Sequence, residues 1–556
     1  MEIINNILGM NLTVEMLIVF ISIGVIVLGQ SYALIKFEGL RLFIAIIFIT
    51  ILGGIYFFFK VSFIPILLPY IIAPSFLIGL LIGISNVEKK AEPLVDVEIR
   101  TRKGKRIIRN VFAGVGIFGA SRSGKTASAI YSLLLHFSKF NFSGLIYDYK
   151  NGELTEICLP LFGERVKIFA IHKPDIGVRI NPINPKYLYD EKDVTAVTKV
   201  LLDNLSGDSV NKGGDNFFDK TAESLLSALI LKFSLYHQHY CTLPHIIAFI
   251  LSVDFSLKTE EAKGLKDEAY GTFEGLRKFL TDDGRVRIQA SSFVLGLASE
   301  KQTAGVISTL ANSLRTVAFP EAFWALSGNE LDLNINHKEN QKVFTILNEP
   351  KSEEALTPVL ATVLHTVTKQ MMVRGQEPAF ILLDEAPTIK LKNMARISAT
   401  MASFKIATIY CAQDISQAVI QYTRDGFKAI LANLSTLFFG RANDPDTGKF
   451  YEQYFEPKKI KTHSRTKGNS NASTTVGERE VPKIRAHEFT KFVPGQFAFL
   501  SGGKAEMIRF PKFDIEVEVL KENKNQELRN RIIENYRTII EEINMFAEQI
   551  GLSEKR

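Results

Sequence analysis

The sequence predicts an α/β protein that begins with membrane-spanning helices. Three observations lead to this prediction. Long uncharged apolar runs fill the first 85 residues, a glycine-rich loop lies between an apolar strand and a helix at 115–135, and a wholly apolar strand ends in two acidic residues at 379–385. The chain has 556 residues, which is enough for two or three domains.

The N-terminal region, residues 1–90, is predicted to be a transmembrane anchor of two or three helices. Met16–Ile35, Leu42–Phe59 and Val61–Ser85 carry no charged residue. Each run is long enough to cross a hydrocarbon core about 30 Å thick. The third run contains three prolines and is therefore either a span or a broken, re-entrant segment.

Cations that flank these runs predict the orientation of the chain. Lys36 and Arg41 separate the first two runs, and a cluster of cations from Lys89 to Arg109 follows the third. Cytoplasmic flanks of membrane helices are enriched in Lys and Arg. The chain after residue 86 is therefore expected to lie in the cytoplasm.

Composition narrows the class of protein further. The three cysteines, Cys158, Cys241 and Cys411, lie far apart, which argues against a disulfide framework and against a zinc site. The formal net charge is +7. This modest basic excess is compatible with binding to nucleic acid or to anionic lipid and does not decide between them.

Residues 119–126 form a phosphate-binding loop motif. They read GASRSGKT and match the pattern GxxxxGK[ST], with an apolar strand before them and a helical stretch after them. Backbone N–H groups of such a loop bind phosphates, the lysine reaches the β- and γ-phosphates, and the threonine binds Mg²⁺. ATP and Mg²⁺ are therefore the predicted cofactors. The predicted nucleotide-binding residues are Gly119, Ala120, Ser121, Arg122, Ser123, Gly124, Lys125 and Thr126.

The strand at 379–385 supplies the acidic residues that a phosphate-binding loop requires. Asp384 is expected to hold Mg²⁺, and Glu385 to act as the general base that polarises the attacking water. Further strands are predicted at 145–150 and 406–413. Gln413 then stands at the carboxyl end of a strand, where ligands bind in open α/β sheets, and is expected to sense the γ-phosphate.

The spacing of these motifs predicts the order of the domains. Apolar residues at helical spacing predict an all-α domain at 190–320, inserted between nucleotide-binding segments at 91–189 and 321–515. A helical tail is expected at 516–556, which either packs on the motor or docks a partner. The basic stretch at 458–477 is predicted to lack packed structure. It is either a mobile loop that neutralises nucleic-acid phosphates in a central pore or a solvated loop with no partner.

A short tetrad near the end of the chain raises an alternative. Leu500–Gly503 reads LSGG, the opening of the signature loop of ATP-binding-cassette transporters. In a transporter cassette that loop precedes the acidic strand, whereas here it follows Asp384. Ser501–Lys504 is therefore predicted to be the turn of a β-hairpin, with glycines at positive φ.

Taken together, these motifs give the chain a resemblance to the type IV coupling proteins, the TraG/TraD class of conjugation and secretion ATPases. The matching stretches run in order through most of the chain after the membrane region. They are GASRSGKT (119–126), IYDYKNGEL (146–154), INPINP (180–185), FFDKTAESLLSALI (217–230), LRTVAFPEAFW (314–324), LLDEAP (382–387), YCAQDISQ (410–417), ANLSTLFFGRANDPDTG (432–448) and PGQFAFLSGG (494–503).

The resemblance implies a RecA-like P-loop motor with an inserted all-α domain. It also implies a homohexamer at the bacterial inner membrane, with the motor in the cytoplasm and nucleotide between neighbouring subunits. Members couple ATP hydrolysis to delivery of a relaxase–single-stranded-DNA complex, or of effector proteins, to a type IV secretion channel. An FtsK-type translocase of double-stranded DNA and a non-motor nucleotide-binding scaffold are the alternatives.

The family's site residues carry over only in part. Lys125, Thr126, Asp384, Glu385 and Gln413 match the motifs. A trans-acting Arg-Lys pair of the family is replaced here by Ser403-Phe404-Lys405. Lys405 or Arg441 is expected to supply that positive charge.

Overall fold

The computed structural model describes residues 27, 73–78, 92–205, 216–255, 273–391, 394–467, 472–523 and 525–552. The predicted membrane runs lie almost wholly outside these residues. None of the helices in the described ranges has the length and apolar character needed to cross a membrane. The chain divides into two units, Met1–Glu92 and Pro93–Arg556, and the second unit contains the strands described below.

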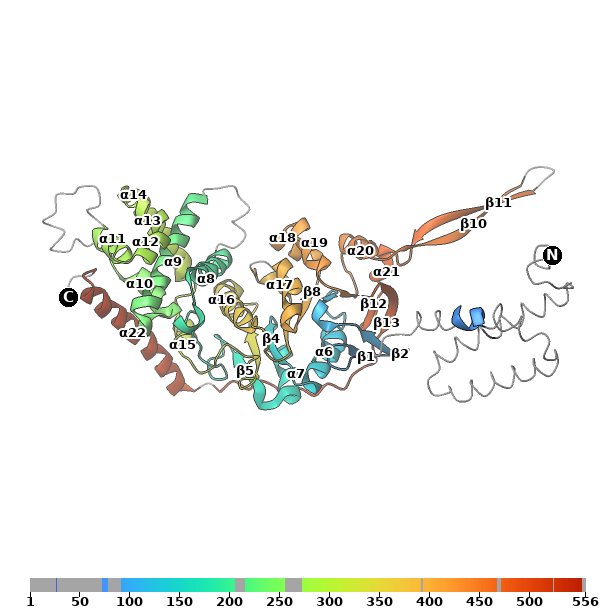
Figure 1. Ribbon diagram of the computed structural model, residues 1–556, viewed down its shortest axis with the longest axis horizontal. Helices are drawn as coiled ribbons and strands as arrows, with labels where there is room; N and C mark the ends of the chain where they lie inside the picture. The colour runs from blue at the N-terminus through green and yellow to red at the C-terminus, as the bar shows by residue number, and fades with distance from the viewer. Residues whose placement is uncertain are drawn as a thin grey trace. The chain divides into compact units, whose positions relative to one another are not determined.

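A nine-stranded sheet forms the framework of the second unit (Figure 1). Its order is β13-β12-β9-β3-β8-β7-β4-β6-β5. The seven strands from β9 to β5 run parallel, and β12 and β13 form an antiparallel hairpin beside β9. The predicted α/β fold is therefore confirmed. The strands are β3 (Val115–Phe118), β4 (Ser143–Asp148), β5 (Val166–Phe169), β6 (Val343–Leu347), β7 (Ala379–Leu383), β8 (Ile406–Ala412), β9 (Thr436–Phe439), β12 (Gln496–Ser501) and β13 (Lys504–Arg509).

Helices bury both faces of the parallel strands. Alternate residues of β7 belong to different hydrophobic clusters, because side chains of a strand point alternately to its two faces. Phe380 packs with α6 (Tyr131–Lys139) and α7 (Glu153–Phe162), and Ile381 packs in the cluster that contains α16 (Glu353–Met371). This double burial explains why the strands read as continuous apolar runs.

A run of helices lies between β5 and β6 in the chain (Figure 1). These helices extend from Glu191 to Leu326, close to the range 190–320 that the sequence suggested for an inserted domain. They are α8 (Glu191–Leu205), α9 (Asn216–Tyr236), α10 (Leu243–Ser252), α11 (Glu274–Thr281), α12 (Gly284–Gln289), α13 (Ser291–Gly296), α14 (Glu300–Arg315) and α15 (Pro320–Leu326).

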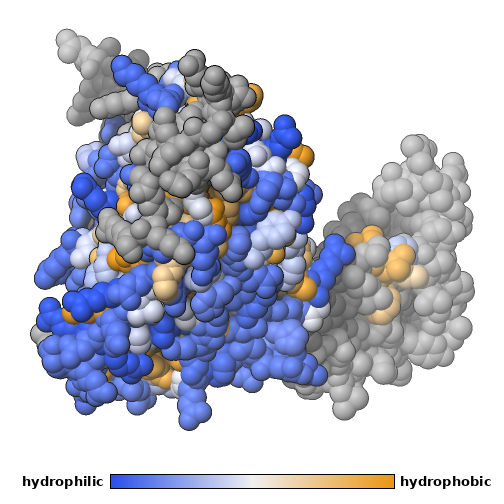
Figure 2. All heavy atoms as spheres, turned by 90° about the vertical axis from the view of Figure 1, so that its left-hand side faces the viewer, coloured by the Kyte–Doolittle hydropathy of each residue, from blue (hydrophilic) through white to orange (hydrophobic). Residues whose placement is uncertain are grey.

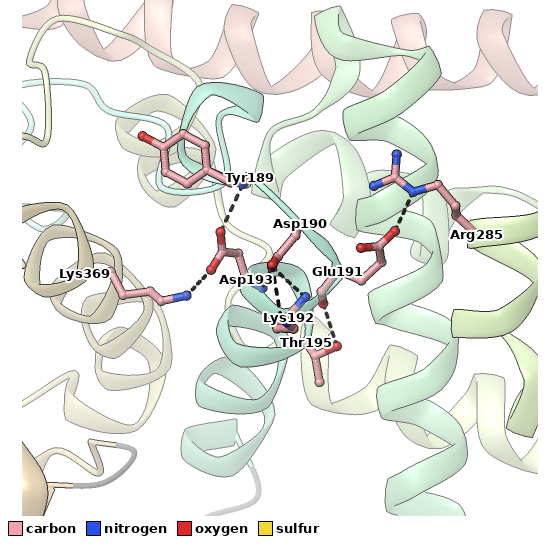
Figure 3. A network of polar contacts seen from close by, with 8 residues as sticks. All are labelled: Tyr189, Asp190, Glu191, Lys192, Asp193, Thr195, Arg285 and Lys369. Carbon is pink, nitrogen blue, oxygen red and sulfur yellow. Dashed lines mark hydrogen bonds and ion pairs between the residues drawn. The ribbon is translucent and has the colours of Figure 1, made fainter.

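The first helix of this run is fixed at its N-terminus from several sides (Figure 3). Asp190 Oδ1 accepts hydrogen bonds from backbone N–H groups of the first turn of α8. The Asp193 carboxylate pairs with Lys369 of α16, while Glu191 pairs with Arg285 of α12 at 2.5 Å. The beginning of α8 is therefore tied both to a helix that covers the sheet and to the other inserted helices.

The tail forms one long helix, α22 (Gln526–Gln549), which contacts α10 and α15. Phe546 joins an aromatic cluster with Phe233, and Tyr536 packs on Phe323 at a ring-centroid distance of 4.8 Å. The expectation that the tail packs on the motor is confirmed for Glu518 and Leu520, whose backbone N–H groups donate to Glu156 of α7, whereas the apolar stripe of α22 meets α10 and α15. Figure 2 shows this end of the molecule with mostly hydrophilic residues and small, separate hydrophobic patches.

The described part of the basic stretch, residues 458–467 and 472–477, has strand structure, so the prediction of an unpacked loop was wrong for this part. It belongs to an antiparallel hairpin of β10 (Pro457–Lys467) and β11 (Ala472–Pro482). Lys459 lies opposite Glu480 in the register. Cross-strand pairs of opposite charge and the high strand propensity of threonine favour pairing, and composition alone did not reveal them.

The hairpin predicted around the LSGG tetrad is confirmed. β12 and β13 pair in antiparallel register, and Gly502 and Gly503 between them have φ of 55° and 73°. Ser501 is the first residue of the four-residue turn and pairs with Lys504, the last, as predicted. It ends β12, is buried, and its Oγ lies 2.9 Å from Oγ1 of Thr436 on β9.

We expect the turn and the strand end of this hairpin to respond differently to substitution. Gly502→Asn should leave the thermal midpoint within about 2 °C, because asparagine tolerates left-handed backbone and an added Cβ meets nothing within 4 Å. Ser501→Arg should destabilise the protein by roughly 3 kcal/mol, because it places a charge at a buried position at the end of a strand. Thermal unfolding of both variants tests this, and equal midpoints would contradict it.

Candidate nucleotide-binding site

The predicted site residues follow the carboxyl ends of neighbouring parallel strands. The order β3-β8-β7-β4-β6 brings these ends to one edge of the sheet. The phosphate loop follows β3, Gln413 follows β8, and the acidic pair follows β7. Asp148 ends β4, and Asn348 follows β6. Ligands bind at this edge in open parallel sheets, so the arrangement is a candidate nucleotide site.

Backbone hydrogen bonds hold the phosphate loop over the sheet. Gly119 N donates to Ala412 O at 3.2 Å, and Ala120 N donates to Arg441 O at 2.7 Å. The ammonium of Lys125 donates to Gly119 O at 2.5 Å and so closes the loop on itself. The loop is therefore anchored to the strands on both sides of β3.

The remaining loop residues occupy distinct positions. Ser121 and Arg122 form the exposed tip, and Arg122 has a positive φ of 59°. Ser123 is buried, and its Oγ has no hydrogen-bond partner among the described residues. Thr126 opens the helical segment that leads into α6. The loop thus runs directly into a helix N-terminus, as phosphate binding requires.

Gly124 is held in close contact with a segment near the end of the motor. Its φ is 87°, and a Cβ at this position would lie 2.7 Å from Gly495 N. Gly495 N donates to Ser123 O at 2.9 Å. The segment that contains the LSGG tetrad therefore does touch the phosphate loop, but through Gly495 at the head of β12. No local sequence signal predicted this contact.

The acidic pair is buried and incompletely hydrogen-bonded. Asp384 and Glu385 are 1% and 2% exposed. Glu385 Oε1 accepts a hydrogen bond from Gln413 N at 2.9 Å. Asp384 Oδ1 and Glu385 Oε2 have no hydrogen-bond partner in the part of the chain that the structure describes. Burial raises the pKa of Asp384 to about 7, even though Lys150 acts in the opposite direction.

Two lysines face these carboxylates. Burial lowers the pKa of Lys125, although Glu385 opposes the shift. Burial also acts to lower the pKa of Lys150, but Asp384 and Glu153 outweigh it, and the pKa is raised. The site therefore combines two ammonium groups, two carboxylates and the loop N–H groups.

This set of groups fits a nucleoside triphosphate with Mg²⁺. Buried carboxylate oxygens without donors are the atoms that a cation would satisfy. The described residues contain no group of three or more His, Cys, Asp and Glu side chains placed to hold a metal ion. Mg²⁺ usually takes one or two protein carboxylates and completes its shell with phosphate oxygens and water, which is what this edge of the sheet offers.

The two candidates for the trans-acting cation lie in different places. Arg441 is half-buried beside its own phosphate loop, and its Nε donates to Asn443 Oδ1 at 3.1 Å. Lys405 is exposed at the amino end of β8. β8 separates Lys405 from Gln413, so Lys405 lies roughly 25 Å from the acidic edge of its own sheet.

The comparison with protein families decides the family of the chain. The model described as "Type IV secretory system Conjugative DNA transfer" matches residues 82–486. The chain belongs to this family. The resemblance to type IV coupling proteins is thereby confirmed. A sequence comparison with curated proteins gives no match.

Solved structures similar to this chain show the same fold. The unbound bacterial conjugative coupling protein TrwB is 12% identical, with a TM-score of 0.58 over 78% of this chain and 91% of that chain. TrwB in complex with the ATP analogue ADPNP is 13% identical, with a TM-score of 0.53 over 74% and 87%. TrwB with ADP and Mg²⁺ is 13% identical, with a TM-score of 0.50 over the same shares.

The structure adds polar residues that the motifs did not single out. Tyr147 is hydrogen-bonded both to Thr388 and to Asn348. Lys150 is the last residue of the strand that the sequence predicted at 145–150. The sequence does show polar residues at the ends of apolar strands, and this pattern could have marked them as candidates. Which of these residues contact one another depends on the order of the strands in the sheet, which the sequence does not show.

Proposed function

We propose that this protein is an ATPase that recruits a relaxase–single-stranded-DNA complex and delivers it to a type IV secretion channel. Membership of the conjugative DNA transfer family supports the DNA cargo. The single observation that carries the ATPase is the meeting of the phosphate loop, Asp384, Glu385 and Gln413 at one sheet edge. A hexamer anchored in the inner membrane through residues 1–90 completes the proposal.

Each residue at this edge of the sheet has a distinct role in the proposed hydrolysis of ATP. Lys125 leaves Gly119 O and binds the β- and γ-phosphates, and the loop N–H groups hold the remaining oxygens. Thr126 and Asp384 would hold Mg²⁺, which neutralises phosphate charge when bound. Glu385 accepts the proton of the attacking water as the water oxygen bonds to the γ-phosphorus. The bond between the γ-phosphorus and the β–γ bridging oxygen of ATP then breaks, and ADP leaves. Gln413 senses the γ-phosphate beside it.

A cation from a neighbouring subunit is part of the proposal. Arg441 O accepts a hydrogen bond from Ala120 N of its own phosphate loop, which favours a role within the subunit. Lys405 is exposed and remote from its own acidic pair. We therefore assign the trans-acting charge to Lys405, where it would stabilise charge that develops on the transferred phosphoryl group.

The proposed function predicts a DNA-stimulated ATPase. We expect the full-length protein in lipid nanodiscs to hydrolyse ATP faster when single-stranded DNA is added. Binding of labelled DNA should weaken steeply with salt, because phosphate contacts release counterions. ATP turnover and DNA anisotropy over a salt series measure both effects.

Each other outcome identifies a different function. Turnover without any response to DNA would overturn the DNA cargo and support an effector-protein receptor. Stronger stimulation by duplex DNA than by single strands would support an FtsK-type translocase. Nucleotide binding without turnover, with or without DNA, would contradict the motor and leave a scaffold.

A further inference from the structure

Glu385 adopts a backbone conformation that a glutamate rarely takes. Its φ is 54° and its ψ is 51°, in the left-handed region. This conformation is strained for a residue with a Cβ, so surrounding contacts must hold it. Glu385 directly precedes the short 3-10 turn Ala386–Thr388, and the contacts that fix this turn fix Glu385 as well.

A line of hydrogen bonds runs from Glu385 across two neighbouring strands. Thr388 Oγ1 donates to Glu385 O at 2.8 Å. Tyr147 OH, on β4, lies 3.0 Å from Thr388 Oγ1. Asn348 Nδ2, just after β6, donates to Tyr147 OH at 2.8 Å. The line therefore follows the strand order β7-β4-β6 and ends on the backbone of the acidic pair.

The direction of every bond in this line can be assigned. Asn348 Oδ1 accepts from Glu349 N at 2.8 Å, so the other amide atom, the one near Tyr147, is the donating nitrogen. The single hydroxyl hydrogen of Thr388 is used on Glu385 O. Thr388 Oγ1 must therefore accept from Tyr147 OH, whose own oxygen accepts from Asn348. All hydrogens point toward Glu385, an arrangement in which the bonds strengthen one another.

Two of the three side chains in this hydrogen-bonded line are buried, and the Tyr147 hydroxyl uses both its donor and its acceptor capacity within it. Tyr147 and Asn348 are fully buried, and burial raises the pKa of Tyr147, so its hydroxyl remains a donor. Tyr451 is also fully buried, but its hydroxyl has no hydrogen-bond partner among the described residues. A buried tyrosine in this fold therefore does not need such a partner to be accommodated. The Tyr147 hydroxyl is fully used, as donor and as acceptor.

We propose that Asn348, Tyr147 and Thr388 are positioning residues that hold Glu385 in its left-handed conformation and aim its carboxylate at the attacking water. The inference rests on the proposed ATPase. Gln413 N holds Oε1 of the carboxylate, and the line from Asn348 holds the backbone of the same residue. Together they leave Oε2 as the oxygen available to take a proton.

Tyr147→Phe tests the proposal because it removes one oxygen atom and keeps the ring in the core. We expect the kcat for ATP to fall by about 10- to 100-fold, because a general base displaced by about 1 Å loses that much. The KM for ATP should stay within about threefold, because Lys125 and the loop bind the phosphates independently. Steady-state kinetics with saturating Mg²⁺ measure both constants.

Thr388 provides a rescue pair and Tyr451 a matched control. Thr388→Val should lower kcat as Tyr147→Phe does, whereas Thr388→Ser keeps the hydroxyl and should restore it to within about threefold of wild type. Tyr451→Phe removes an unpartnered buried hydroxyl and should leave kcat unchanged. Equal loss in Tyr147→Phe and Tyr451→Phe, or equal kcat in the two Thr388 variants, would overturn the proposal.

Separate results would refute the positioning role of Tyr147 and the proposed ATPase activity. If the wild-type protein hydrolyses ATP and a folded Tyr147→Phe variant matches its kcat, the positioning line is refuted and the ATPase stands. If the wild-type protein binds the fluorescent analogue mant-ATP without any turnover, the proposed function fails, and the positioning proposal fails with it. Binding of mant-ATP to each variant separates loss of binding from loss of turnover.

Discussion

Glu385→Gln is expected to lower ATP turnover by about 1,000-fold while Mg²⁺–ATP still binds. The substitution is isosteric, so Oε1 can still accept the hydrogen bond from Gln413 N. The phosphate loop is untouched. What disappears is the group that accepts the proton of the attacking water. Turnover and equilibrium binding of mant-ATP, measured on the same preparation, check the two parts of this expectation.

Two companion variants make the result interpretable. Lys125→Ala should lose turnover and also weaken nucleotide binding, because it removes an ammonium that contacts the phosphates. Glu354→Gln makes the same chemical change at an exposed position of α16 and should behave as wild type. If Glu385→Gln retains more than about a tenth of wild-type turnover, Glu385 is not the general base.

Local patterns were enough to predict the centre of the fold. The phosphate loop, the strand before it and the acidic strand each carry their signal within a short stretch of sequence. Parallel strands that are buried on both faces read as continuous apolar runs, and β7 and β8 are of this kind. Ends of parallel strands meet at one sheet edge, so predicting the strands also predicted which residues would approach one another.

Contacts between distant segments could not be predicted in this way. Gly495 lies against Gly124 because β12 joins the sheet beside β9. Nothing in the local sequence of either segment predicts this contact. Asn348 and Tyr147 meet for the same reason, since β6 lies next to β4. The strained φ of Glu385 is equally invisible in a sequence, because glutamate is the residue expected after that strand in either conformation.

The sequence also could not predict which helices the C-terminal helix α22 packs against. Its apolar stripe was evident from helical spacing, which predicts that the stripe is buried but not what buries it. The structure pairs Glu542 of α22 with His245 of α10 at 2.9 Å. Complementarity of this kind depends on two helices that are far apart in the sequence.

Asp384→Asn is expected to make the nucleotide-free protein more stable at alkaline pH. Burial raises the pKa of Asp384 from its ordinary value of 3.8 to about 7. The folded protein therefore binds a proton that the unfolded chain has already released, and folding stability falls as the pH rises from about 4 to about 7. Between about pH 5 and pH 8 this loss amounts to roughly 2.5 kcal/mol, and an asparagine does not incur it.

Thermal unfolding in EDTA at both pH values measures this difference. The wild-type midpoint should fall more steeply with rising pH than the Asp384→Asn midpoint. Addition of Mg²⁺ and ATP should reverse the ranking, because a cation at Asp384 stabilises the carboxylate and an amide cannot replace it. Parallel pH profiles for the two proteins would show that the charge of Asp384 is not a source of instability. The buried carboxylate of Asp384 then destabilises the fold until the nucleotide and Mg²⁺ bind. Such a cost in stability is expected where a buried charge is needed for catalysis.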